Sequence, residues 1–111
     1  MMKKDQGIYE GDFSCREDVE REYQVGLDKN VRIVYAGYWY ADYNGDSVVL
    51  FKQNRKLYEV RGGHCSCYGL EGQWEPDVVT KEQMLHMFKE GTYYTHCKDS
   101  IMRAMGWKET A

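Results

Sequence analysis

The fold is decided by residues 31–51, which read VRIVYAGYWYADYNGDSVVLF. Both halves of this stretch are rich in β-branched and aromatic residues, which favour strands. Between the halves lies Asn44-Gly45, the dipeptide preferred in two-residue type I′ hairpin turns. The stretch therefore predicts a strand over 31–43, a turn at Asn44-Gly45 and a returning strand over 46–53.

A third strand is expected directly after this hairpin. Polar residues 53–56 favour a turn, and residues 57–61, LYEVR, then return to a strand-like composition. The alternation in this strand is only approximate, so the pattern leaves the buried face open while favouring Tyr58 and Val60 inside. Together the three strands predict an antiparallel meander.

A first helix is expected to begin near residue 14. Ser14 and Glu17 match the Ser-x-x-Glu capping box, which satisfies free amide groups at a helix start. Val19, Tyr23 and Leu27 then recur every four residues and form one apolar stripe. We therefore expect an amphipathic surface helix, preceded by a flexible N-terminal arm over residues 1–13, where no period is sustained.

Two more helices are expected in the last third of the chain. Thr80 and Gln83 match a second capping box, and Val79 and Met84 are spaced as its hydrophobic staple. A further short helix would point one face inward and end at a glycine; the residues concerned are Cys97, Ile101, Met102, Met105 and Gly106. The sequence thus predicts an α+β class, in which an antiparallel meander of three to four strands packs with two or three short helices in one domain over 14–111.

Charge and hydropathy exclude some classes of function. The formal net charge is −3, and no basic block is long enough to follow a phosphate backbone, so direct nucleic-acid binding is not expected. The acidic balance is compatible with an acidic partner protein or with a DNA mimic. No run of about 18 apolar residues predicts a membrane span. Without an apolar secretion signal we expect a cytoplasmic protein, whose four cysteines are thiols or metal ligands rather than disulfides.

Residues 62–76, GGHCSCYGLEGQWEP, hold the side-chain types that most readily bind metals or act as nucleophiles. If the last helix folds back on the meander, a zinc site could form from His64, Cys65, Cys67 and Cys97, with His96 beside them. Against zinc, the spacing is Cys-x-Cys rather than the repeated Cys-x-x-Cys of ribbon-type sites.

The same segment has two other interpretations. His64 could lower the pKa of Cys65 or Cys67 and make the protein a small cysteine-dependent enzyme, although no third orienting residue is identifiable. Alternatively the histidine bonds to backbone groups in a tight turn and the cysteines are small core residues. The sequence favours this structural role, and therefore no cofactor, with zinc as the alternative.

Aromatic residues predict a contact surface. Strand alternation cannot bury Tyr38, Trp39 and Tyr40 on one face together, so at least one of them should be accessible. Aromatic side chains often dominate the energetics of interfaces. The residues expected to contact a partner are Trp39, Tyr40, Tyr43 and Trp74. A helix of the same chain or a second copy in a homodimer could equally cover this face.

Several segments carry a resemblance: YAGY at 35–38, DYNGD at 42–46, KLYEV at 56–60, HCSCYGLE at 64–71 and QWEP at 73–76. With them, residues 31–90 resemble a family of small proteins encoded by bacteriophages and prophage-bearing bacteria. The resemblance carries over no activity, but it implies a setting, because small phage accessory proteins often bind and inhibit host machinery, including defence systems such as CRISPR.

These observations together favour a phage-type accessory protein rather than an enzyme. It would bind and inhibit or modulate a bacterial host protein in the host cytoplasm by direct contact. The alternative is a zinc-binding domain or a cysteine enzyme centred on His64, Cys65, Ser66 and Cys67.

Overall fold

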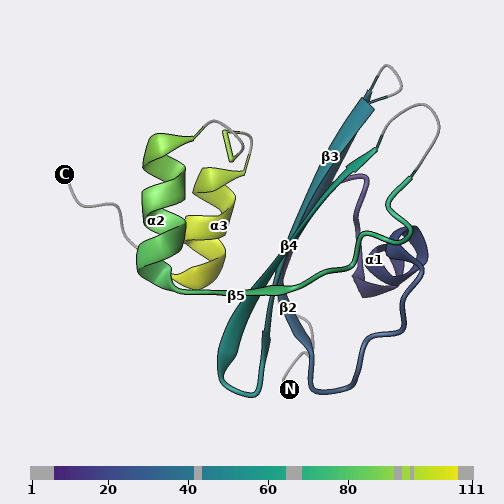
Figure 1. Ribbon diagram of the computed structural model, residues 1–111, viewed down its shortest axis with the longest axis horizontal. Coiled ribbons are helices and arrows are strands. Elements are labelled where there is room, and N and C mark those ends of the chain that lie inside the picture. Colours follow the sequence, from purple (N-terminus) through teal and green to yellow (C-terminus); the bar gives the residue numbers. More distant parts are fainter. Residues whose placement is uncertain (1–6, 42–43, 65–68, 92–93, 96, 108–111) are drawn as a thin grey trace.

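A computed structural model describes residues 7–41, 44–64, 69–91, 94–95 and 97–107 of the chain (Figure 1). In chain order its elements are β1 (Ile8–Gly11), α1 (Arg16–Tyr23), β2 (Arg32–Ala41), β3 (Asn44–Gln53), β4 (Lys56–His64), β5 (Asp77–Val79), α2 (Lys81–Glu90) and α3 (Lys98–Met105). The expected α+β class is confirmed.

The strands form one five-stranded sheet in the order β1-β2-β3-β4-β5. The meander of β2, β3 and β4 is antiparallel, as predicted, and β5 adds to it in the same sense. However, β1 pairs with β2 in parallel, so the sheet is mixed. The prediction of a purely antiparallel sheet of three to four strands is therefore wrong in both sense and strand number.

The two strands that the sequence did not indicate lie at the edges of the sheet. β1 comes from the segment expected to be an N-terminal arm, and it places Ile8–Gly11 alongside residues 35–38 of β2. β5 has three residues, which pair with residues 57–59 of β4. Both strands are too short for a period-2 pattern to show. Their positions in the sheet depend instead on pairing with a longer neighbouring strand.

The hairpin between β2 and β3 differs from the prediction in its turn. Ala41 pairs with Asn44, so that Asn44 and Gly45 belong to β3, and residues 42–43 between the strands lie outside the described part of the chain. The positive φ angles of a type I′ turn occur instead at Asn54 (53°) and Arg55 (68°), between β3 and β4.

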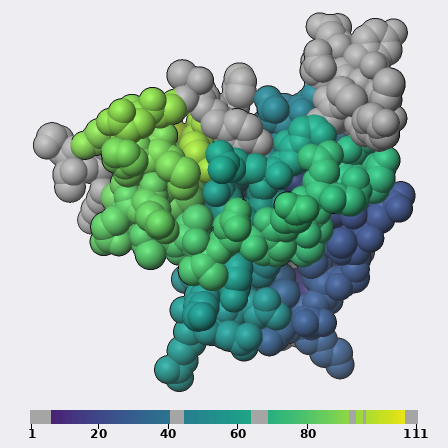
Figure 2. Space-filling model, viewed as in Figure 1, coloured from purple at the N-terminus to yellow at the C-terminus, as the bar shows by residue number. Residues whose placement is uncertain are grey.

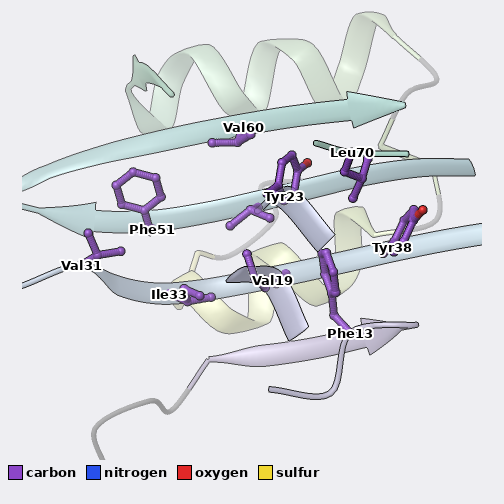
Figure 3. Close-up of a cluster of buried hydrophobic side chains, with 11 residues drawn as sticks. Phe13, Val19, Tyr23, Val31, Ile33, Tyr38, Phe51, Val60 and Leu70 are labelled. Carbon is purple, nitrogen blue, oxygen red and sulfur yellow. The ribbon is translucent and has the colours of Figure 1, made fainter. Parts of the chain in front are cut away.

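Both faces of the sheet are covered (Figure 1 and Figure 2). On one face α1 packs over a cluster whose buried members are Phe13, Val19, Tyr23, Val31, Ile33, Ala36, Tyr38, Val49, Phe51, Val60 and Leu70 (Figure 3). On the other, α2 and α3 pack over Tyr35, Val48, Leu50, Val79, Met84, Tyr94, Cys97 and Ile101. Val60 is buried and Tyr58 half-buried on the α1 face, as favoured from the sequence. The alternation of polar and apolar residues in β4 is only approximate because a strand covered on both faces has no polar side.

The helix predictions are largely confirmed. The capping box at Thr80 is present, because its hydroxyl accepts from the Gln83 amide at 3.1 Å while the Gln83 side chain accepts from the Thr80 amide at 2.9 Å. α3 ends at Gly106, whose φ of 73° is left-handed. The Ser14 capping box is wrong: α1 is capped at Cys15 without a side-chain bond, and the Ser14 amide donates to Asp18.

Candidate functional site

The strand register gathers the segments that stood out in the sequence at one end of the sheet. Gly45 of β3 pairs with Tyr40 on one side and with His64 on the other. We call residues 39–41, 44–46 and 62–64 the distal end of the sheet. In Figure 1 this end of β3 extends past α1. The aromatic hairpin and the start of the His-Cys-Ser-Cys segment are therefore neighbours in space.

Gln73 closes the base of the segment that follows β4. Its side-chain oxygen accepts from the Gly63 amide at 2.9 Å, and its side-chain nitrogen donates to the Gly63 carbonyl at 2.7 Å. The same nitrogen donates to the Gly69 carbonyl, also at 2.7 Å. One amide side chain thus takes the place of a neighbouring strand at Gly63 and ties both ends of residues 63–69 together.

Leu70 and Trp74 anchor the same segment in the α1 cluster. Leu70 is fully buried and lies beside Tyr23 (Figure 3). The half-buried ring of Trp74 stacks on Phe51, with ring centres 5.6 Å apart and 10° between the planes. Its second aromatic contact is edge-on with Tyr23 at 5.1 Å. Three residues of the GLEGQW run therefore have a structural role.

Gly62 provides room for a buried polar pair below this segment. The Tyr23 hydroxyl donates to the Ser47 hydroxyl at 2.9 Å, and Ser47 is fully buried. A Cβ atom on Gly62 would lie 2.7 Å from the Tyr23 hydroxyl and 3.0 Å from a Leu70 methyl group. Such approaches are too close, so β4 needs glycine at this point for α1 and Leu70 to pack against it.

Tyr40 is the exposed aromatic residue of the distal end. Its exposed fraction is 46%, and its ring lies 6.5 Å from that of the buried Tyr38. Burial is the main cause that raises the pKa of Tyr38 to about 12, and the nearby carboxylates of Glu22, Asp12 and Glu71 act in the same direction. The carboxylates of Asp12, Glu22 and Glu71 thus act on the buried ring that neighbours Tyr40.

The other expected contact residues lie elsewhere or outside the description. Trp39 is partly buried on the α2–α3 face, where its ring covers Gly37: a Cβ atom there would meet the indole at 2.5 Å. Trp74 lies on the opposite face, in the α1 cluster. Tyr43 lies outside the described residues. Trp39, Tyr40 and Trp74 do not form one patch, whereas the prediction that one of Tyr38, Trp39 and Tyr40 stays accessible is confirmed at Tyr40.

The expected zinc ligands are described only in part. His64 ends β4, and the structure describes its backbone; Cys65, Cys67 and His96 lie outside the described residues. Cys97 is buried on the α2–α3 face among Tyr35 and the apolar residues of that cluster. Within the described ranges, no three histidine, cysteine or acidic side chains are grouped so that they could hold a metal ion.

Cys97 should be an unreactive thiol. Burial is the main cause that raises its pKa to about 12, and the carboxylates of Glu10 and Glu59 act in the same direction. Very little of this thiol would be the reactive thiolate at pH 8. We expect iodoacetamide to label the exposed Cys15 readily and to label Cys97 only after unfolding, as read by mass spectrometry of the two peptides. Equal labelling rates in the native protein would contradict this assignment.

Sequence reasoning missed a set of buried polar contacts beneath α3. Glu10 of β1 accepts from the Tyr35 hydroxyl at 2.7 Å and from the Ser100 hydroxyl. Glu59 of β4 is 4% exposed and accepts from the Tyr94 hydroxyl. A signal was present at Glu59, since a lone acid inside the strand-like run LYEVR is unusual. No such sequence signal was present at Glu10, because β1 itself was not predicted.

The fold and the distal end define an α+β protein whose mixed sheet separates one helix from two. No protein-family model matches the chain, and neither the curated proteins nor the solved structures include a match. None of the helices in the described residues is long and apolar enough to cross a bilayer.

Proposed function

We propose that the protein is a phage-type accessory protein that binds a bacterial host protein through the distal end of the sheet and inhibits or modulates it. A host defence system such as CRISPR is the kind of target that the resemblance implies. The observation that carries the proposal is the exposed Tyr40, which stands at the end of the sheet where the hairpin and the segment clamped by Gln73 meet.

Three properties of this surface support protein contact. An aromatic ring with a polar end is among the side chains enriched at the centre of interfaces. The carboxylates of Asp12, Glu22 and Glu71 lie close enough to influence the neighbouring Tyr38, so they can add electrostatic steering of a partner. The clamp at Gly63 holds the backbone of the distal end in place, which reduces the entropy that a partner must remove on binding.

The test compares the two large hydrophobic residues that are most exposed among those described. Tyr40 is 46% exposed at the distal end, and Val78 is 52% exposed on β5, near the other end of the sheet. We expect the wild-type protein and the Val78→Ala variant to capture the same protein from bacterial lysate. The Tyr40→Ala variant should bind that protein, once purified, at least about tenfold more weakly.

Both variants change an exposed side chain, so their stability should stay close to that of the wild type, and circular dichroism melting serves as the check. Activity of the captured protein should fall on addition of wild type and change less with Tyr40→Ala. Unchanged affinity in Tyr40→Ala, or a loss in Val78→Ala alone, would place the contact surface elsewhere.

A further inference from the structure

The contact between the sheet and the α2–α3 layer contains a buried acid with little compensation. Glu59 projects from β4 toward this layer, where its carboxylate accepts from Tyr94, which lies just before α3. Among the residues that the structure describes, its cationic partner is Arg61, whose guanidinium nitrogen lies 3.7 Å from the other carboxylate oxygen and whose side chain is 49% exposed. A half-exposed, long ion pair compensates only part of the cost of burying a charge.

Among the described residues, the other groups around Glu59 do not neutralise it. Asp77 on β5 is a second acid nearby, and Cys97 at the start of α3 is a neutral thiol that also senses the charge of Glu59. Met87 of α2 places its thioether sulfur 4.0 Å from the Tyr94 hydroxyl. Opposite Glu59 in the register lies Leu50, which is fully buried. Burial is the main cause that raises the pKa of Glu59, Arg61 lowers it, and Asp77 raises it again.

We propose that the α2–α3 layer is a proton-linked cover of the sheet, which closes more firmly when Glu59 is protonated and loosens when Glu59 is ionised. In the closed state the protonated acid still holds Tyr94 by a hydrogen bond and carries no buried charge. In the open state the carboxylate reaches water and regains the ordinary behaviour of a glutamate. The contact through Ser100 and Glu10 joins α3 to β1 at a separate point.

The direction of the pH dependence follows from these two states. Because the pKa of Glu59 is higher in the closed state, closing takes up a proton. Closure is therefore firmest below the ordinary pKa of a glutamate, weakens as the pH rises from there to the raised pKa of the closed state, and stays constant above that value.

Amide hydrogen exchange measured from pH 4 to pH 8, corrected for the intrinsic exchange rate, tests this proposal. In the wild-type protein the protection of α2 and α3 should fall by roughly tenfold across this range. Amides in the centre of β2 and β3 report on global unfolding, which also returns Glu59 to water, so the Glu59-linked part of their pH dependence should be of the same size. Glu59→Gln keeps an acceptor for Tyr94 without a charge, so protection of its helices should be independent of pH and at least as high as in the wild type at low pH.

The matched control is His86→Gln, which removes the exposed histidine of α2 and should leave the wild-type pH dependence in place. Helix protection that does not change with pH in the wild type would overturn the proposal, whether or not the Glu59→Gln variant folds. So would a pH dependence that persists unchanged in Glu59→Gln or one that disappears in His86→Gln.

Discussion

Replacing Gly62 by alanine should lower the free energy of unfolding by about 3 kcal/mol, because the added methyl group overpacks the core and disrupts a buried hydrogen bond. The new Cβ atom would lie 2.7 Å from the Tyr23 hydroxyl and 3.0 Å from Leu70. Both neighbours are fully buried. Tyr23 would have to give up its bond to Ser47, or α1 would have to shift away from the sheet.

The matched control is the adjacent Gly63→Ala variant. Among the described atoms, a Cβ atom on Gly63 would meet the Gly45 carbonyl oxygen, at an ordinary 3.8 Å. The two hydrogen bonds between the Gln73 side chain and Gly63 involve only the backbone of Gly63, so a methyl group at this position does not remove them. This variant should change the stability by less than about 1 kcal/mol. Urea unfolding of the two variants gives the comparison, and equal stabilities would refute the packing described at Gly62.

Replacing Trp74 by alanine should cost about 2–4 kcal/mol of stability, below the roughly 3–5 kcal/mol of a fully buried aromatic side chain because the Trp74 ring is half-buried. The loss has two parts. Loss of the stack on Phe51, whose ring centre lies 5.6 Å away, would open one side of the α1 cluster. The edge contact with Tyr23, at 5.1 Å, would also disappear. Since Gln73 precedes Trp74 directly, the clamp on Gly63 should also loosen.

Trp74→Phe is the control, because a phenyl ring can keep most of the stack on Phe51; the expected loss is below about 1.5 kcal/mol. Circular dichroism in urea is the suitable measurement, since the tryptophan itself is removed. If Trp74→Ala is as stable as the wild type, the ring does not anchor the segment, and a role for Trp74 in partner contact would gain weight. If the prediction holds, lost partner binding in Trp74→Ala would by itself say nothing about contact.

The parts of the fold that the sequence predicted are those encoded by local patterns. The capping box around Thr80 depends on residues within one turn of each other, and so it appears in the structure as expected. The meander is likewise local, because its strands are consecutive. At Asn44-Gly45 the local preference was overridden, since the register that pairs Gly45 with both Tyr40 and His64 keeps this dipeptide inside β3.

The parts that the sequence did not predict depend on contacts between distant residues. β1 is four residues long and is held by a neighbour more than twenty positions away, which no window of the sequence can show. The role of Gln73 depends on its side chain reaching the backbone of Gly63, 10 positions earlier, which the glycine-rich run does not indicate. Trp39 and Trp74 were grouped by residue type, yet the sheet passes between them.

The most direct test of the central claim is amide hydrogen exchange of the protein alone and in complex with the partner that it captures. Our account predicts that binding slows exchange in peptides covering residues 39–46 and 62–73, and leaves α2 and the β3–β4 turn unchanged. Protection of α2, α3 or β5 with no change at the distal end would contradict the account, because the partner would then be bound by a different surface.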